Sequence, residues 1–310
     1  MLAAGAVHAQ PYPSKPVRFV VPFAAGGPTD VMTRGLASVM GGPLGQQMVI
    51  DNRPGAGGNI AAAHVAGGPA DGYTVLVAGQ AILAINKALY PSLAYDPDRD
   101  FAWIGMLGSI PNVLVAHPDA VPARSVKELI ELARVQPGKI SYGSNGVGSL
   151  SHLSTEVLAN AAGVKFLHVP YQGAAPQQAD LLAGRIGFSL IGTSAALPLV
   201  KSGKLRALAV STDARIPTLA DVPTLVESGY PKLDVPVWFA AVAPAATPAP
   251  VLATLRNAFA QSIATPAYAA EIAKQAGLVV DMSPQRAAEM LARERQTWSD
   301  AVRATGATAN

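Results

Sequence analysis

The chain has 310 residues, of which 50% are apolar and 14% are charged, as is typical of a folded globular protein with one large domain or two. It contains no cysteine, which excludes disulfides, thiolate zinc sites and cysteine nucleophiles. The net charge is +3 and no run of basic residues marks a nucleic-acid-binding surface, so we expect no nucleic-acid partner.

The first ten residues are small and apolar, and they end at Val7-His8-Ala9, which is similar to a signal-peptidase site. We interpret residues 1–10 as the remnant of a secretory signal that is cleaved after Ala9. The alternative, an ordinary disordered N-terminus, stays open. The longest uncharged stretch, Val235 to Leu255, holds four prolines, so we expect no transmembrane helix.

Short apolar runs that favour strands alternate with helical patterns along the first third of the chain, which predicts a parallel α/β architecture. A helix is predicted from about Thr29, with Met32, Leu36, Val39 and Met40 on one face. A second, alanine-rich helix is predicted at 60–65. The predicted strands are 17–21, 48–51 and 73–78.

A second series of strands and helices is predicted from residue 113 onward. Ser125 and Glu128 form a capping-box pattern, which predicts a helix start. A helix after Ser149 is predicted to bury Leu150, Leu153, Val157 and Leu158 and to carry Ser149, His152 and Glu156 on its other side. The predicted strands are 113–116, 140–142, 165–169, 186–191, 205–210 and 238–242; residues 214–236 are predicted as connection, and two C-terminal helices follow, the second at Ser283-Pro284.

Two glycine-rich turns, Phe23 to Asp30 and Ser144 to Ser149, each follow a predicted strand and open a predicted helix. Neither matches a P-loop or a complete dinucleotide-binding fingerprint. Such turns offer backbone N–H groups and a positive helix end, which suit a carboxylate. Two plain connecting turns remain an equal alternative.

Catalysis and metal binding have little support in the sequence. Tyr142 stands where a nucleophile elbow needs glycine, so a hydrolase that uses Ser144 with His168 is kept only as a competing hypothesis. The five histidines show no metal-ligand spacing. The residues favour holding a ligand over reacting with it, and we expect no metal and no cofactor.

Several motifs occur in an order that resembles one family. They are VVPFAAGGPTD at 20–30, DNRPGAGGN at 51–59, SLSHL at 149–153, HVPYQG at 168–173, GKLRALAV at 203–210 and DVPT at 221–224. Together they resemble the Bug-type, TctC-like periplasmic solute-binding proteins of tripartite tricarboxylate transporters, over nearly the whole chain past Tyr12.

The resemblance implies an α/β, two-domain, periplasmic-binding-protein-like fold of type II, with a ligand in the interdomain cleft. Domain 1 is expected to comprise 11–110 with 236–310, and domain 2 to comprise 111–235. Hinges are expected near Pro111 and Asp234. The expected function is periplasmic capture of a small carboxylate by a monomer, without enzymatic activity, and its delivery to membrane permease subunits. The alternative is a carboxylate sensor of the same fold that feeds a signalling kinase.

The resemblance also implies that the two turns grip one carboxylate group of the ligand. His152 sits at the family's Ser-x-x-His position, and Tyr171 and Gln172 match its Tyr-Lys-Gly segment, with Gln172 in place of Lys. The remote end of the ligand is expected to contact Gln80, Trp238 and residues near 191–194. The full candidate set is Phe23, Ala25, Gly26, Gly27, Thr29, Asp30, Gln80, Ser144, Asn145, Ser149, His152, Tyr171, Gln172, Thr193, Ser194 and Trp238.

One departure from the family concerns the predicted strand at 185–193. Many members carry acidic residues where this chain has Leu190-Ile191-Gly192. An acidic side chain would pair with the ammonium group of an amino acid, so its absence favours a dicarboxylate without an amine. An aromatic acid such as terephthalate is one candidate, and adipate-like or malate-like acids are its rivals.

Overall fold

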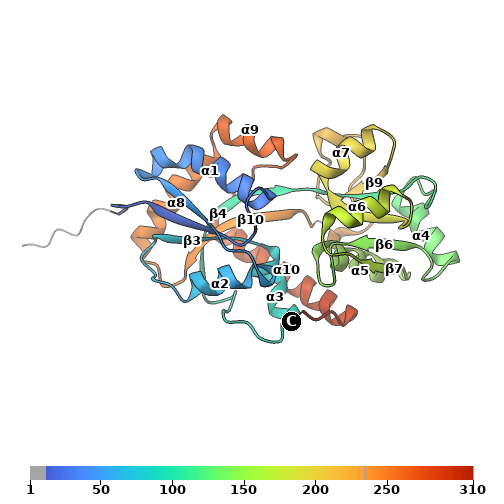
Figure 1. Cartoon of the computed structure of the whole chain (residues 1–310), viewed down its shortest axis with the longest axis horizontal. Helices are drawn as coiled ribbons and strands as arrows, with labels where there is room; N and C mark the ends of the chain where they lie inside the picture. The colour runs from blue at the N-terminus through green and yellow to red at the C-terminus, as the bar shows by residue number, and fades with distance from the viewer. Residues whose placement is uncertain (1–11, 234, 310) are drawn as a thin grey trace, which may run out of the picture.

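Two five-stranded sheets organise the chain, and helices flank each of them (Figure 1). The structure is a computed structural model that describes residues 12–233 and 235–309. The predicted signal remnant at 1–10 and the predicted hinge residue Asp234 therefore lie outside the described residues.

The first sheet has the strand order β2-β1-β3-β10-β4. Strand β1 runs parallel to β2 and β3, whereas β10 runs antiparallel to β3 and β4. Met32, Leu36 and Met40 of α1 pack into the core on one face of this sheet. The strands are β1 (Val17–Val21), β2 (Met48–Asn52), β3 (Thr74–Gly79), β4 (Phe101–Ile110) and β10 (Val237–Pro244), and the helices are α1 (Pro28–Leu44), α2 (Asn59–Ala66), α8 (Ala249–Ile263) and α9 (Pro266–Lys274).

The second sheet has the strand order β7-β6-β8-β5-β9. Strand β6 runs parallel to β7 and β8, whereas β5 runs antiparallel to β8 and β9. Its strands are β5 (Asn112–Ala116), β6 (Ser141–Ser144), β7 (Leu167–Pro170), β8 (Phe188–Gly192) and β9 (Arg206–Val210), and its helices are α4 (Val126–Val135), α5 (Leu150–Ala162), α6 (Ala174–Leu182) and α7 (Thr193–Lys201).

The α/β class predicted from the sequence is confirmed, but the sheets are mixed and not parallel throughout. The antiparallel strands β5 and β10 adjoin the two points where the chain passes from one sheet to the other. Strand β4 was not predicted because Phe101–Ile110 is almost wholly buried and is interrupted by Gly105 and Gly108, so it shows no alternation of polar and apolar residues. Among the described residues, three helices and not the predicted two follow β10.

Helix starts that the sequence signalled are formed as expected. The hydroxyl groups of Ser125, Ser149 and Ser283 each accept a hydrogen bond from the first turn of their helix. Glu128 completes the first of these caps differently from the predicted box, because its carboxylate accepts from the amide of Arg124, at 2.8 Å.

A long C-terminal helix, α10 (Pro284–Thr305), contacts both halves of the molecule. Its first half places Ala287 and Met290 in a hydrophobic cluster with Trp238 of the first sheet. Its second half places Trp298 and Val302 in the cluster that contains the α5 side chains of the second half. We call the half of the molecule that contains the first sheet the first lobe, and the half that contains the second sheet the second lobe. Figure 1 shows the end of α10, in red, beneath the second lobe. This helix therefore connects the two lobes mechanically.

Candidate ligand-binding cleft

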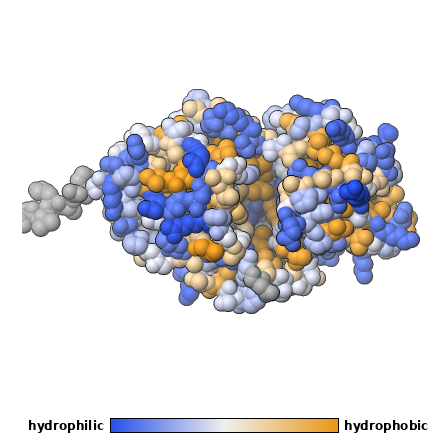
Figure 2. Space-filling view, viewed as in Figure 1, coloured by the Kyte–Doolittle hydropathy of each residue, from blue (hydrophilic) through white to orange (hydrophobic). Residues whose placement is uncertain are grey.

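A cavity of about 320 Å³ lies between the two sheets. The first sheet contributes Phe23, Pro28 and Thr29 at the start of α1, several residues of the segment 79–86, and the start of β10. The second sheet contributes Gly148, Ser149 and Leu150 at the start of α5. In the space-filling view, a hollow with hydrophobic residues at its base separates the two lobes (Figure 2).

The two glycine-rich turns thus reach one cavity, although they lie more than 100 residues apart in the sequence. Thr29 and Ser149 both line it. The first-turn amides of a helix have no partner within that helix, and they carry the positive end of its dipole. Because α1 and α5 begin at the same cavity, two helix ends favour a negative group there.

The first turn is held closed by the buried carboxylate of Asp30. This group accepts hydrogen bonds from the amide of Gly26 at 2.9 Å, from Nε of Arg34 at 2.8 Å and from Nδ2 of Asn52 at 3.0 Å. The same amide group of Asn52 donates to the carbonyl of Phe23, at 3.0 Å. Burial opposes the charge on Asp30, but these donors outweigh it and lower the pKa of the carboxyl group. Asp30 is therefore ionised, and its negative charge is balanced by the positive charge of Arg34.

The second turn is built around Ser144, which is fully buried. Its Oγ lies 2.7 Å from Nε2 of His168 and donates to the carbonyl of Gly146, at 3.1 Å. Ser144 and His168 thus form the pair that the hydrolase hypothesis requires. The nucleophile is inaccessible, however, and both side chains hold the turn in place.

His152, which was predicted on the side of its helix opposite the apolar face, is buried. Its ring stacks on His168 with centroids 4.0 Å apart, and its Nδ1 accepts from the amide of Gly148 at 3.1 Å. Burial lowers the pKa of both histidines; for His168, burial and then the charge of His152 lower it to about 4. Both rings are therefore neutral at pH 7.

Gln80 is the side chain in the cavity whose hydrogen bonding is incomplete. It is 4% exposed, and its buried Nε2 has no hydrogen-bond partner in the described structure. An unpaired buried donor costs about 1–3 kcal/mol, so a ligand oxygen that accepts from it would remove this cost. Gln80 follows β3 directly and begins the segment of η2 (Ala81–Ile85) and α3 (Asn86–Leu89).

A smaller cavity of about 100 Å³ adjoins the first one and shares Leu150 and Val237 with it. Gln177 lines it, donates from Nε2 to the carbonyl of Gly143 at 3.1 Å, and leaves its buried Oε1 without a partner in the described structure. Asn145 and the pair Ile191-Gly192 also line it. Among the described residues, neither cavity is lined by an acidic, basic or histidine side chain.

The predicted site residues divide into three groups in the structure. Phe23, Thr29, Gln80, Ser149 and Trp238 line the larger cavity, and Asn145 lines the smaller one. A second group makes hydrogen bonds that stabilise the two turns and does not line either cavity: Gly26, Asp30, Ser144 and His152. The remaining predicted residues lie outside both cavity linings: Ala25, Gly27, Tyr171, Gln172, Thr193 and Ser194.

Two of these remaining residues have clear structural partners. Tyr171 donates its hydroxyl to Asp180 at 2.8 Å, and Thr193 donates its hydroxyl to the carbonyl of Pro111 at 2.6 Å. Gln172 and Ser194 are exposed. Sequence reasoning missed the contribution of Ile82, Asn86 and Gln177. The first two follow the carboxyl end of a parallel strand, where α/β proteins place ligands, and this position was the available signal.

The described residues contain no helix that is long and apolar enough to span a membrane. Within the same ranges, no group of three or more side chains is arranged to hold a metal ion.

Comparison with known proteins identifies close similarity over most of the chain. Residues 32–307 match the family described as the tripartite tricarboxylate transporter family receptor. Protein BugT of Bordetella pertussis is 36% identical over 305 residues, which cover 98% of this chain and 93% of BugT. A solved R. palustris protein with adipate is 35% identical with a TM-score of 0.80, covering 96% of this chain and 99% of that one. MatC from Rhodopseudomonas palustris, solved with bound malate, is 31% identical with a TM-score of 0.76. The match covers 94% of this chain and 100% of MatC.

Proposed function

Because this chain belongs to the tripartite tricarboxylate transporter receptor family, a family of periplasmic solute-binding proteins and not of enzymes, we propose that it captures a small dicarboxylate. The ligand binds in the cavity between α1 and α5 and is passed to the membrane permease subunits of a tripartite transporter. The observation that carries the proposal is the convergence of two helix N-termini and the unpaired amide of Gln80 on one cavity.

One carboxylate of the ligand is bound by the first turns of α1 and α5. Thr29 and Ser149 supply hydroxyl groups beside the free helix amides, and a carboxylate accepts several such hydrogen bonds at once. Asp30 and Ser144 support the binding turns without touching the ligand, because their polar atoms are already engaged within the turns. His152 supports the second turn through Nδ1, which accepts from the amide of Gly148. Ala25, Gly27, Tyr171, Gln172, Thr193 and Ser194 stay predictions as ligand contacts.

The remote end of the ligand lies between Gln80, Trp238 and the smaller cavity. Trp238 and Phe239 are apolar residues of this part of the wall, and among the described residues no acidic side chain lines either cavity to bind an ammonium group. These features support a dicarboxylate with a carbon chain or ring and no amine. The bound adipate and malate of the two relatives fit this class, and terephthalate is its aromatic member.

The two lobes act as two domains, 11–110 with 236–310 and 111–235. The strand membership of the two sheets supports this division. The C-terminal helix α10 qualifies it, because Trp298 and Val302 pack into the second lobe. The proposed location of the protein in the periplasm is supported by its family and by the signal pattern at 1–10.

A thermal-shift and calorimetric screen tests the proposal. Adipate, malate, terephthalate, monocarboxylates and amino acids are added to the purified protein at pH 7. A ligand present at 100 times its Kd stabilises the protein by about 2.7 kcal/mol, which is easily measured. We expect stabilisation by at least one dicarboxylate and none by amino acids. Stabilisation by amino acids alone would contradict the inference that a chain without acidic residues at Ile191 and Gly192 binds acids that lack an amine.

A matched pair of variants locates the binding site. Replacement of Ser149, as Ser149→Ala, removes a hydroxyl from the cavity, whereas Ser202→Ala removes an exposed hydroxyl at the end of α7. We expect weaker binding of the dicarboxylate only in the first variant. Equal affinities in both variants would place the ligand elsewhere.

A further inference from the structure

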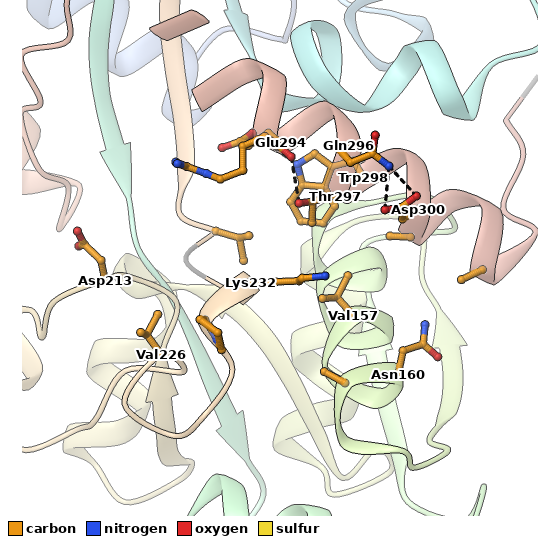
Figure 3. A pocket seen from close by; sticks show the side chains of 16 residues that line it. Val157, Asn160, Asp213, Val226, Lys232, Glu294, Gln296, Thr297, Trp298 and Asp300 are labelled. Carbon is orange, nitrogen blue, oxygen red and sulfur yellow. Dashed lines mark hydrogen bonds between the residues drawn. The ribbon is translucent and has the colours of Figure 1, made fainter. Parts of the chain in front are cut away.

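Behind the cleft, a second and larger cavity of about 960 Å³ lies between α5, α10 and the segment 213–235 (Figure 3). Glu294 of α10 lines this cavity at the point where the helix passes from the first lobe to the second. Its Oε1 accepts a hydrogen bond from Nε1 of Trp238, at 2.9 Å. Trp238 also lines the ligand-binding cleft, so one residue contacts both Glu294 and that cleft.

Two further groups face the carboxyl group of Glu294. Nε1 of Trp298 donates to Oε2 at 3.5 Å, as the dashed line in Figure 3 shows. The side-chain amide of Gln80 is close enough to favour the charged form of Glu294, although its Nε2 makes no hydrogen bond of ordinary geometry. Gln80 and Trp238 are therefore shared between Glu294 and the ligand-binding cleft.

The negative charge of Glu294 lacks a close positive partner among the described residues, since none of the salt bridges there includes it. Arg293, its neighbour on α10, provides only a weak favourable interaction. The other charged groups around the larger cavity are Lys232 and Asp213 from the connecting segment and Asp300 from α10, which is paired with Arg303. The α5 residues that line the cavity are uncharged.

We propose that Glu294 takes up a proton when a carboxylate binds in the cleft, so that ligand affinity and the protonation of Glu294 are linked. This inference rests on the proposed function, because it requires an anionic ligand beside Gln80 and Trp238. An anion in the cleft and an anionic Glu294 repel each other, because Glu294 contacts the buried residues Gln80 and Trp238, which also line the cleft. Protonation removes the repulsion and keeps a hydrogen-bond acceptor for Trp238.

The free protein is poised for this uptake near neutral pH. Burial raises the pKa of Glu294 to about 7, against the opposing hydrogen bonds from Trp238, Trp298 and Gln80. If Glu294 is fully protonated in the complex over this pH range, about half a proton is taken up per ligand at pH 7. The affinity then rises about tenfold between pH 8 and pH 6. Glu294 acts as a positioning residue, because it contacts the ligand only through its neighbours.

The first measurement uses the ligand-free protein. The intrinsic fluorescence of the protein, to which Trp103, Trp238 and Trp298 contribute, is recorded from pH 5.5 to 8.5. The proteins compared are the wild type, Glu294→Gln and Glu289→Gln, which changes an exposed glutamate on the same helix. We expect a transition near pH 7 in the wild type and in Glu289→Gln, and none in Glu294→Gln. A transition that persists in Glu294→Gln would overturn the assignment of the titrating group.

The second measurement is the calorimetric Kd of adipate and of malate at pH 6, 7 and 8, in buffers of different ionisation enthalpy. The wild type should show proton uptake and the tenfold change in affinity, whereas Glu294→Gln should bind with the same Kd at all three pH values. Binding of either acid by the wild type without pH dependence would overturn the linkage and leave the proposed function intact. Absence of binding at every pH would instead overturn the proposed function, and the linkage with it.

Discussion

The imidazole rings of His152 and His168 stack almost in parallel, with centroids 4.0 Å apart and an angle of 9° between their planes. Nε2 of His168 is hydrogen-bonded to the hydroxyl of Ser144, and Nδ1 of His152 accepts a hydrogen bond from the amide of Gly148. The pair therefore supports both ends of the turn that opens helix α5. Protonation of both rings is unfavourable, because two positive charges at this distance repel each other.

Acid should destabilise the protein through His168. Its pKa falls from 6.5 to about 4 on folding, so the native state binds fewer protons than the unfolded state between these values. Stability is therefore fully present above pH 6.5 and is lost as the pH falls toward 4. We expect the melting temperature to drop over this window, and to drop less in His168→Asn. The control is His64→Asn, at an exposed position, which should follow the wild type. An identical pH profile in all three proteins would contradict the prediction.

Removal of the buried amide of Gln80 should separate stability from binding. In Gln80→Met, the unpaired Nε2 is replaced by an apolar group of similar size, so the ligand-free protein should melt at the same temperature or higher. The hydrogen bond to the ligand is lost, and the affinity for a dicarboxylate should fall about five- to tenfold. Chemical denaturation and calorimetry measure the two effects. A variant that loses stability while it keeps full affinity would show that Gln80 has a purely structural role.

Neutralisation of Asp30 should loosen the first turn. Asp30→Asn loses the charge that pairs with Arg34 and one of the acceptors for Gly26 and Asn52, and we expect a loss of about 2 kcal/mol in the free energy of unfolding. Glu271→Gln, which breaks an exposed ion pair with Lys274, should change stability by less than about 0.5 kcal/mol. Urea denaturation compares them; equal small losses would show that the turn does not depend on Asp30.

A β-carbon at Gly148 should disturb the contact between the lobes. Gly148 has φ of 76°, and an added Cβ would lie 2.7 Å from Cδ1 of Leu89 in α3. Gly163 has a similar φ of 65° but nothing within 4 Å of an added Cβ. Both alanine variants carry the left-handed strain of about 1 kcal/mol, and Gly148→Ala should lose about 1–3 kcal/mol more through overpacking. Equal melting temperatures for the two variants would indicate that Leu89 moves aside without cost.

Ligand should close the two lobes about the crossing segments near Pro111 and Asp234. The carbonyl of Pro111 accepts hydrogen bonds from both the amide and the hydroxyl of Thr193, so this crossing is anchored to the second lobe and the bend must occur beside it. Small-angle scattering should show a smaller radius of gyration with saturating dicarboxylate, as in other cleft-closing proteins. An unchanged radius at saturation would contradict closure.

Much of the local structure was predictable because it depends on neighbouring residues. Strand β1, the start of α1 after Gly27 and the Ser149 cap all follow from patterns within a few residues. Strand β4 escaped prediction because burial on both faces removes the alternation that identifies a strand. The antiparallel direction of β5 and β10 was also unpredictable, since it depends on how the chain crosses between the sheets.

The sequence by itself determined the two glycine-rich turns, the helices that they open, and the lack of acidic residues at Leu190-Ile191-Gly192. These are properties of short segments, in which backbone conformation and local hydrogen bonds decide the outcome. Only the tertiary structure decided that Ser144 is buried against His168 and that Trp238 donates to Glu294. It also decided that the carboxylate of Asp30 accepts hydrogen bonds from Arg34 and Asn52. Residues 238 and 294 are brought together by the packing of α10 on the first sheet, and no pattern within either segment encodes that distance.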